Sequence, residues 1–486
     1  METPAVLPPD MWERTPPEAQ AYIRALEARL GALESMMQAL QEQNRALQER
    51  LNQNSRNSAR PPSSDPLQSP RPPRPRSGRR RGGQPGHPGS TRPLIPVEEV
   101  DEVVVLKPDR CSGCHAPLLG DDPTPFRHQV IEIPPIQPVV TEYQWHQLVC
   151  PECGETTRAP WPEAVPSGSY GPRAHATVAL CTGAYRLSKR TTQQVMDDLF
   201  GVPMSVGTIR QSEKLTTEVV AEPVEEARAS VPEQPVAHLE ETSGREGGKR
   251  AWRWVAVTSL VTVFVVRRSR GGQVARELVG ERFSGILVTD RSSAYNWYPV
   301  RWRQRCWSHV LRDFEAIRGR GGASEEIGDA LLAQAHQMFT WWHRVREGTL
   351  ARSTFRSSMT PLRREVERLL EAGSQCGVAT TEGTCREMLK RREALWTFVQ
   401  VEGVEPTNNT AERSIRPGVQ WRKGSFGTQS EAGSRYVERM MTVVATLKQQ
   451  KRNVLTYLVA AHEAALRGET APSLLPANEQ KSQTAA

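Results

Sequence analysis

Near the N-terminus, apolar side chains recur at alternating steps of three and four residues. The pattern persists for about four heptads, with leucine at every d position and one polar residue, Asn44, among the a positions. Such a pattern favours a parallel, two-stranded coiled coil. We therefore expect residues 18–54 to form a dimerisation helix in a homodimer or higher oligomer; one amphipathic helix packed on its own domain is the alternative. The pattern comprises Ile23, Leu26, Leu30, Leu33, Met37, Leu40, Asn44, Leu47 and Leu51.

Residues 55–100 lose this periodicity and are rich in proline, arginine, serine and glycine. Such a composition buries too little apolar surface to offset the entropy lost on ordering, so it predicts a disordered linker. The chain has 63 basic residues (Lys and Arg) against 55 acids, and nine arginines with one acid in residues 55–92 match its whole charge of +8. The linker, with Arg79, Arg80 and Arg81 at its most basic point, is expected to contact nucleic-acid phosphates, unless it is only a solvated tether.

Two CxxC motifs lie within residues 101–160. Each motif presents two thiolates from one tight turn, and two such turns close a tetrahedral zinc site. The alternating segment 139–149 between the motifs predicts a strand that returns the second pair to the first. We expect structural zinc rather than redox chemistry, the alternative. The expected ligands are Cys111, Cys114, Cys150 and Cys153.

Residues 165–228 carry helical patterns. The segments 191–200 and 205–215 flank a short turn that contains Gly-Val-Pro, an organisation typical of a helix-turn-helix. We expect this block to bind DNA through the second helix, although an ordinary helical hairpin fits the pattern nearly as well. The side chains expected to face a groove are Ser205, Thr208, Arg210 and Gln211.

From residue 232 the pattern changes to short strands. Four β-rich segments, VAHLEET, WRWVAVTS, VTVFVVRRS and GILVTD, with the helix-like GGQVARELVG before the fourth, indicate an α/β domain. We assign residues 232–314 and 401–440 to this core and residues 315–400, rich in helix formers, to a helical insertion. Residues 441–486 are predicted to form a C-terminal helix and tail.

Length and composition narrow the class of protein. A chain of 486 residues suggests about three domains. The longest apolar run, Trp254 to Val266, is too short to span a bilayer, and the N-terminus lacks the features of a signal peptide. Eight cysteines are too few for a disulfide scaffold. We therefore expect a cytoplasmic protein.

Three acids stand at positions where a carboxylate is costly unless it has a task. Glu240 and Asp290 end the first and fourth strand segments, and Glu412 lies in the polar segment NNTAERSIR about 120 residues later. Carboxylates from separate elements are the oxygen ligands that Mg²⁺ (or Mn²⁺) prefers for phosphoryl displacement. Spacing alone makes this a weak hypothesis.

Four ordered segments strengthen it. GILVTDRSSAYN, RQRCWSHVLRDF, NNTAERSIRP and WRKGSFGTQSEAGSR resemble the core of the IS66-family transposases of bacterial insertion sequences. The zipper, the RRRGGQPGHPG linker and the paired CxxC motifs are similar to that family's other segments, in the same order. The resemblance covers residues 20–465.

The resemblance implies an RNase H-like catalytic domain with a DDE triad. Asp290 would be the second acid and Glu412 the third. The first should be the aspartate of an Asp-Glu-Thr motif, but this chain has Glu240-Glu241-Thr242. Glutamate moves the carboxylate by about 1.5 Å, whereas Mg²⁺ demands near-ideal octahedral geometry. Catalytic competence therefore depends on whether the backbone or the rotamer of Glu240 adjusts.

Further residues match the family's motifs beside the second and third acids. His309 is expected to position phosphate or metal together with Arg312, unless Cys306 and His309 form only a packed pair. Basic residues around Glu412 are expected to bind the DNA backbone. These are Arg413, Arg416, Arg422 and Lys423.

Together these features imply a Mg²⁺-dependent DNA transposase that cuts insertion-sequence ends and joins them to target DNA, in some elements with element-encoded helper proteins. The rival hypothesis is a catalytically inactive, transposase-derived DNA-binding protein, because of Glu240. A zinc-containing nuclease of cellular function is disfavoured by the order of the motifs.

Overall fold

The computed structural model describes residues 9–54, 57, 92–163 and 165–476. Arg79, Arg80 and Arg81 and most of the predicted linker lie outside the described residues. No helix within the described part of the chain is long and apolar enough to cross a membrane.

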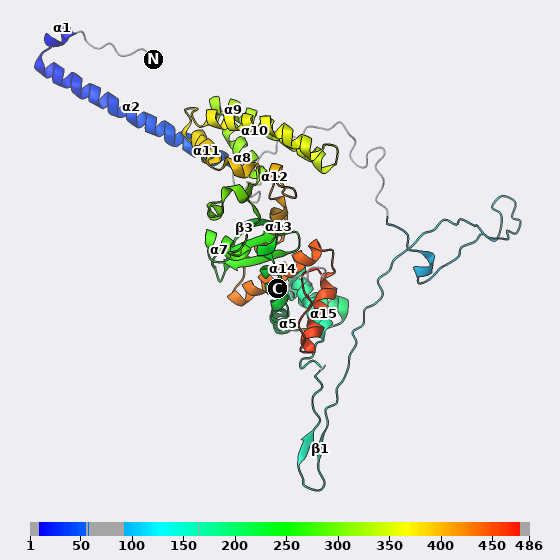
Figure 1. The fold of residues 1–486 in the computed structure, drawn as a ribbon. Helices are drawn as coiled ribbons and strands as arrows, with labels where there is room; N and C mark the ends of the chain where they lie inside the picture. Colours follow the sequence, from blue (N-terminus) through cyan, green and yellow to red (C-terminus); the bar gives the residue numbers. More distant parts are fainter. Residues whose placement is uncertain (1–8, 55–56, 58–91, 164, 477–486) are drawn as a thin grey trace.

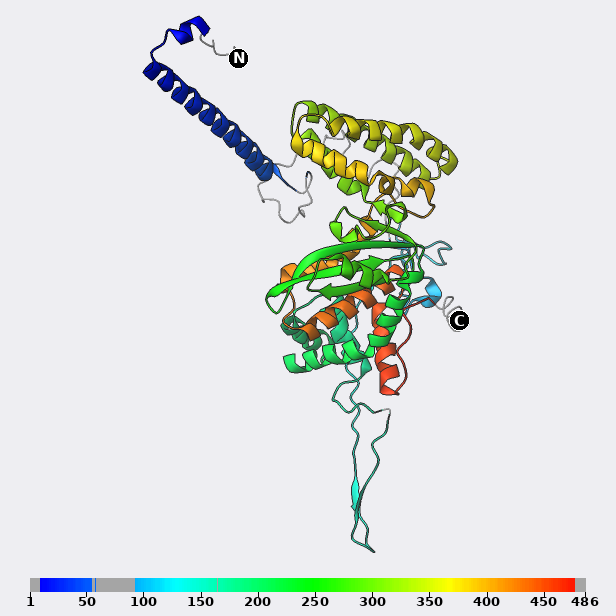
Figure 2. The same cartoon turned by 60° about the vertical axis from the view of Figure 1, so that its left-hand side comes forward.

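The N-terminal heptads form one long helix. After the short helix α1 (Pro9–Glu13), α2 (Pro17–Asn52) runs for 36 residues and projects away from the remainder of the chain (Figures 1 and 2). Its apolar stripe is exposed, with Leu33 at 59% and Leu40 at 62%. The predicted helix is therefore present, and its apolar face is open to a partner.

Residues 92–163 form extended arms with little regular structure. The 3₁₀ turn η2 (Val97–Glu99) and the antiparallel hairpin β1 (Gln147–Val149) and β2 (Thr156–Arg158) are the regular elements described there. The strand predicted over 139–149 is wrong in its length, because only its last three residues pair with a neighbour. Residues 139–146 alternate in sequence but are exposed and lie against no second strand.

A five-stranded mixed sheet forms the core, in the order β5-β4-β3-β6-β7. Strands β3, β4 and β5 pair antiparallel with one another, and β6 and β7 run parallel to β3. Helix α7 (Gly272–Val279) connects the two groups. The strands are β3 (Val236–Glu246), β4 (Lys249–Val257), β5 (Thr262–Arg267), β6 (Ile286–Thr289) and β7 (Arg303–Arg305).

Alternating side chains of β4 cover two different cores. Trp254 and Ala256 face the cluster that includes α7, whereas Val255 and Val257 pack with Ile415 from α13 (Asn409–Ser425). Both faces of the sheet are therefore buried, and α13 lies across the face that also carries Glu240, the partner of Val255.

Helix α14 (Glu431–Gln449) seals the free edge of the sheet with its side chains. The hydroxyls of Thr446 and Thr442 accept hydrogen bonds from the N–H groups of Thr262 and Phe264, both at 3.0 Å. In the same way, the Glu438 carboxylate accepts a hydrogen bond from the N–H of Val266. Four-residue steps on a helix thus match two-residue steps on a strand. Because α14 covers β5 along its length, residue 440 is no boundary between core and tail.

Helices cover the rest of the molecule. A helical block before the sheet, within residues 172–233, packs beside α14 together with α15 (Val454–Leu466). A second group of helices, the bundle, follows β7 and lies above the sheet in Figure 2. The block contains α3 (Pro172–Ala179), the π-helical turn η3 (Leu180–Ala184), α4 (Lys189–Phe200), α5 (Val206–Val219), α6 (Ala221–Ala229) and η4 (Val231–Glu233). The bundle contains α8 (Trp307–Arg318), α9 (Ala323–Arg346), α10 (Arg352–Gly373), α11 (Ala379–Lys390), η7 (Arg392–Leu395) and α12 (Thr397–Gln400), and the short turns η5 (Ser293–Tyr295) and η6 (Val300–Trp302) precede β7.

Candidate active site

The register of the sheet brings the first two acids level. His238 on β3 pairs with Val288 on β6, so Glu240 and Asp290 stand two residues further along neighbouring parallel strands. Glu240 is not at the end of its strand, as its sequence segment indicated, because β3 continues to Glu246 as one arm of the hairpin with β4. It lies instead where the pairing with β6 stops.

Glu412 joins them from the first turn of α13. Burial, and then the charges of Asp290, Glu241 and Glu412, raise the pKa of Glu240 well above its usual value. Asp290 and Glu412 therefore both lie within electrostatic reach of Glu240, although the carboxylate oxygens of the three acids do not all lie within 4.8 Å of one another. Like charges gathered in this way are costly for a folded protein unless a cation or protons neutralise them.

The oxygen donors of this cluster suit a hard divalent cation such as Mg²⁺ or Mn²⁺. Asp290 is held in place at one oxygen, since the backbone N–H of Ser292 donates to its Oδ1 at 2.8 Å. Glu240 accepts a hydrogen bond at Oε2 from the amide of Asn408, at 2.9 Å. These three acids are the residues that would hold such an ion.

The neighbouring Glu241 points to the other side of β3 and belongs to a different network. Its carboxylate accepts hydrogen bonds from the Tyr295 hydroxyl and from Arg270 Nε, the latter at 2.9 Å. Burial, and then the charge of Asp290, raise the pKa of Glu241, while Tyr295 and Arg270 oppose that rise. Of the two consecutive glutamates, Glu240 is thus the one that faces Glu412.

Cys306 and His309 both lie against the third acid. Cys306 Sγ is 3.8 Å and His309 Nδ1 is 3.6 Å from Glu412 Oε1. Burial, and then the charge of Glu412, raise the pKa of the Cys306 thiol to about 12, so the sulfur keeps its proton at neutral pH. Burial lowers the pKa of His309 and outweighs the charges of Asp290 and Glu412, which raise it; the charge of Arg312 lowers it as well. The imidazole of His309 thus lies against Glu412, but its buried Nδ1 makes no hydrogen bond to any described residue.

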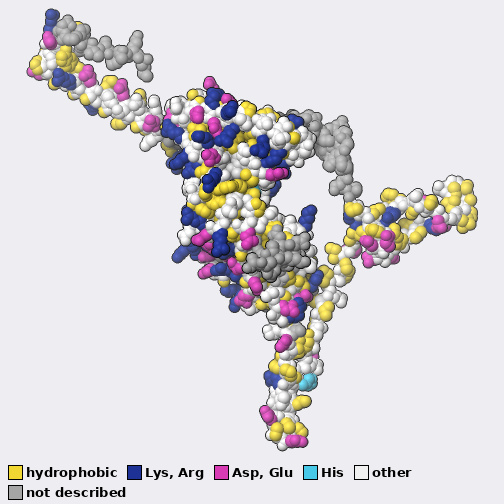
Figure 3. Space-filling view, viewed as in Figure 1, with side chains coloured by type: hydrophobic (Ala, Val, Ile, Leu, Met, Phe, Trp, Pro, Cys, Tyr) yellow, Lys and Arg dark blue, Asp and Glu magenta, His cyan; other side chains and the backbone are white. Residues whose placement is uncertain are grey.

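The predicted basic residues of α13 divide into two kinds. Arg422 reaches back to β3, where its guanidinium donates to the Ser243 hydroxyl at 2.9 Å, so it fastens the helix to the sheet. Arg413 and Arg416 are exposed within about one turn of Glu412, and Lys423 is exposed about three turns further along α13. In Figure 3, lysine and arginine side chains are spread over the bundle and the region of the sheet, interspersed with acids.

The helix-turn-helix pattern is present in α4 and α5. Gly201 ends α4 in the left-handed region at φ 61°, and the hydroxyl of Ser205 caps α5 by accepting the N–H of Thr208 at 3.0 Å. Arg210 and Gln211 are exposed on α5. The opposite side of α5 is buried against α3, α14 and α15.

The two CxxC turns have the same backbone geometry. Cys111 and Cys150 each donate their N–H to the carbonyl five residues later, at 2.9 and 2.8 Å, and accept from the N–H four residues later at 2.9 Å. That fourth residue, His115 or Gly154, is left-handed, with φ 61° and 72°. N–H groups within each turn lower the pKa of Cys111 and Cys150, which favours the thiolates that a zinc ion binds.

The structure does not bring the two turns together. Among the described residues, the ligand atoms of Cys306, His309 and Glu412 form the one group of three or more that lies within 4.8 Å. The predicted return of the second pair to the first is not seen among the described residues, where the strand between the turns spans only Gln147–Val149. Each turn is nevertheless formed as half of a zinc site.

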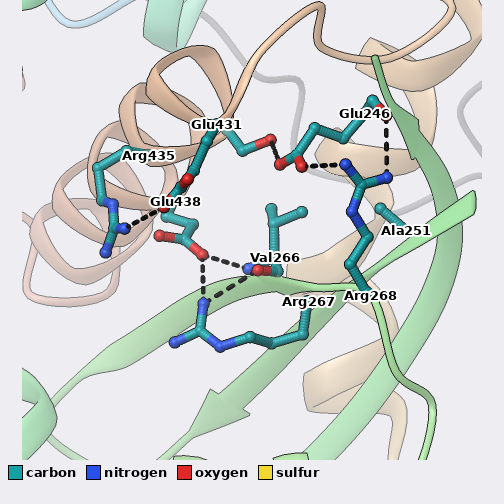
Figure 4. A pocket seen from close by; sticks show the side chains of 9 residues that line it. Glu246, Ala251, Val266, Arg267, Arg268, Glu431, Arg435 and Glu438 are labelled. Carbon is teal, nitrogen blue, oxygen red and sulfur yellow. Dashed lines mark hydrogen bonds and ion pairs between the residues drawn. The ribbon is translucent and has the colours of Figure 1, made fainter. Parts of the chain in front are cut away.

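A hollow of about 390 Å³ lies away from the acids, between β5 and α14 (Figure 4). Its charged walls are already paired: Arg267 with Glu438 at 2.9 Å, Arg268 with Glu246 at 2.6 Å, and Arg435 with a glutamate one turn earlier on α14. Because the charges satisfy one another, this hollow offers a ligand little, and the carboxylate cluster is the better candidate.

Fold and site together define a mixed α/β protein with clustered carboxylates on a central sheet and a separate cysteine module. The sequence model of the Transposase IS66 family matches residues 167–436, more than half of the chain, so the chain belongs to this family. The zinc-finger binding domain of transposase IS66 matches residues 108–154, which contain all four cysteines of the two turns, and a family of unknown function (DUF6444) matches residues 7–93.

A curated relative adds a partial match. The chain is similar to "Uncharacterized protein y4qI" of Sinorhizobium fredii, with 31% identity over 205 residues. The match covers 38% of this chain and 36% of the relative's length.

Two contributors to the site were missed in the sequence. Asn408 stands one residue before α13 and donates to Glu240, and the Tyr295 hydroxyl donates to Glu241. The doubled asparagine before the third acid was a visible signal for the former, but nothing in the local pattern pointed to Tyr295.

Proposed function

We propose that this protein is a DNA transposase with an RNase H-like core that cleaves insertion-sequence ends and joins them to target DNA by DDE chemistry. The observation that supports the proposal is that Asp290, level with Glu240 at the end of β6, and Glu412 on α13 both act electrostatically on Glu240 of β3. The strand order, with three antiparallel strands followed by two parallel ones, supports the core that the family resemblance implies.

The three acids would hold Mg²⁺ or Mn²⁺. Bound there, such ions activate a water and stabilise the charge on a phosphoryl group during in-line displacement. The chain fixes the donor positions: Ser292 orients Asp290, and His309 lies against Glu412. Water would attack the phosphodiester at the element end and break the P–O3′ bond, which leaves a 3′-hydroxyl and a 5′-phosphate. The 3′-hydroxyl would then attack a target phosphodiester and displace the target's 3′-oxygen, which leaves as a hydroxyl.

DNA would be held by several basic elements. The exposed Arg413 and Arg416 near Glu412 would bind the backbone of the reacting strand, and Lys423 would bind DNA about three turns further along α13. Arg422 keeps α13 in place. Arg210 on α5 and the arginines of the linker, including Arg79, Arg80 and Arg81, would add contacts to the element end. The coiled coil would pair two chains, and with them two ends, in the bacterial cytoplasm.

Cleavage of a labelled duplex that carries the element's terminal repeat, in Mg²⁺ or Mn²⁺, tests the proposal. Wild type should nick the strand at the repeat, whereas Asp290→Asn and Glu412→Gln should not. Lys448→Ala, an exposed change at the far end of α14, is the matched control and should cleave as wild type does. Equal product from wild type and both acid variants would trace the cleavage to another source and refute the proposal.

Glu240 supports the second candidate, a DNA-binding protein without catalysis. Its side chain is one methylene longer than the family's aspartate, and Asn408 already donates a hydrogen bond to one of its carboxylate oxygens. Glu240→Asp in the same assay separates the two: cleavage by the variant alone would favour the inactive protein, and cleavage by wild type would favour the enzyme.

A further inference from the structure

Asn408 immediately precedes α13 but does not act as a helix cap. Asparagine at this position ordinarily accepts an N–H of the first turn with its side chain. Here the side chain makes no capping hydrogen bond, although it is completely buried. The amide points away from its own helix and toward β3, so its burial serves a contact between distant parts of the chain.

Its amide nitrogen joins two groups of β3. Nδ2 donates to the carbonyl of Leu239 at 2.7 Å and to Oε2 of Glu240 at 2.9 Å. The first bond anchors the amide to the backbone of the strand, and the second directs the carboxylate of Glu240. Both donor hydrogens of the amide are thereby used.

His238 fixes which way the amide faces. The two acceptors around Nδ2 identify that atom as the nitrogen, so Oδ1 must face His238 Nδ1, 3.2 Å away. Because an amide oxygen can only accept, His238 donates from Nδ1 in this contact. A flipped amide would leave Glu240 beside an oxygen and His238 beside an N–H.

The backbone of Asn408 links the remaining elements. Its N–H donates to Cys306 Sγ at 3.1 Å, and its carbonyl accepts the N–H of Glu412 at 3.1 Å. One residue thus contacts the strand of the first acid, the end of β7 and the third acid itself.

We infer that Asn408 is a positioning residue: its amide holds the carboxylate of the longer Glu240 side chain where that carboxylate can bind a divalent cation. His238 fixes the orientation of this amide. This inference rests on the proposed function, since it assigns a task within that site. It gives a physical reason why glutamate can stand where the family has aspartate. The donor of Asn408 fixes one oxygen of the longer side chain and leaves the other oxygen for the cation.

Binding of Mn²⁺ to the full-length, zinc-loaded protein, followed by electron paramagnetic resonance or calorimetry, tests the inference without DNA. Asn408→Leu keeps the volume and removes both donors, and it should weaken Mn²⁺ binding at least tenfold. In a Glu240→Gln background the same change should have almost no further effect. Ser324→Ala, which removes a buried hydrogen bond to Thr381 in the bundle, is the control and should bind Mn²⁺ as wild type does.

The outcomes separate the two levels of the argument. If Asp290→Asn binds Mn²⁺ as tightly as wild type, the carboxylates are not the metal site and the proposed function fails. If Asp290→Asn loses binding while folded Asn408→Leu keeps it, only the inference on Asn408 fails. Should Asn408→Leu not fold, His238→Phe decides: it leaves Asn408 intact but frees its amide, and unchanged Mn²⁺ affinity in that variant overturns the inference.

Discussion

Replacing two d-position leucines of α2 should break the protein into monomers. Leu33 and Leu40 lie in the middle of the heptad pattern and are 59% and 62% exposed on the single chain. Exposed leucines in one row along 36 helical residues are stable in water when a second helix covers them. The change to make is Leu33→Ala with Leu40→Ala, which keeps the helix propensity high.

The exposed fractions set the size of the effect. Complete burial of a leucine stabilises by about 1.5–3 kcal/mol, and somewhat more than half of each side chain is available for burial here. Allowing for the methyl group that alanine retains, each replacement costs about 1 kcal/mol. A dimer contains four replaced side chains, so the loss is about 4 kcal/mol, or roughly a thousandfold in the dissociation constant.

Sedimentation equilibrium of the full chain measures this directly across a range of concentrations. Ser35→Ala with Glu42→Ala, two exposed changes at f positions of the same heptads, is the matched control and should sediment as wild type does. A wild-type protein that is monomeric throughout, or a leucine variant that dimerises as tightly as the control, would refute the coiled coil and favour α2 as a helix that docks elsewhere.

Three further predictions concern the acids, the zinc module and a buried histidine. Glu412→Gln should reduce strand cleavage about a thousandfold or more, measured by single-turnover kinetics, with DNA affinity unchanged. Cys153→Ser should lower the bound zinc below one ion per chain in metal analysis, since it removes one thiolate of four. Burial, and then the charge of His175, lower the pKa of His462 to about 4 from 6.5, so the unfolded state takes up a proton first as pH falls. His462 alone should therefore contribute a loss of stability in urea of about 3 kcal/mol between pH 6.5 and 4, measured as the difference between the pH profiles of wild type and His462→Gln.

Local patterns predicted the elements better than the contacts between them. The heptads predicted a helix over 18–54, where α2 spans Pro17–Asn52, because a helix forms from near neighbours. The alternating segment 139–149 predicted a strand but formed only its last three residues, since a strand needs a partner that no local pattern supplies.

The same limit applies to the site. Acid type and spacing, with the family resemblance, indicated Glu240, Asp290 and Glu412, and in the structure the charges of Asp290 and Glu412 both act on Glu240. Asn408 was not predicted because its bond to Glu240 joins residues 168 positions apart, and its neighbours in sequence predict an ordinary helix cap. Long-range polar contacts of this kind depend on the finished fold.

The register of the sheet explains why a large insertion leaves the acids undisturbed. Thr289 on β6 pairs with Arg305 on β7, so Asp290 and Cys306 stand level, in the same row as Glu240. After Cys306 the chain enters α8, the first helix of the bundle, and it comes back to the acids at Asn408.

The segments that precede and follow the bundle are hydrogen-bonded to each other. The N–H of Trp307 donates to the carbonyl of Pro406 at 2.9 Å, and the N–H of Asn408 donates to Cys306 Sγ at 3.1 Å. Because the bundle begins and ends at one point, changes in its length or packing need not move Glu412 relative to Asp290. The bundle is thus free to vary for other tasks, whereas the short segments around Cys306 and Asn408 carry the geometry of the site.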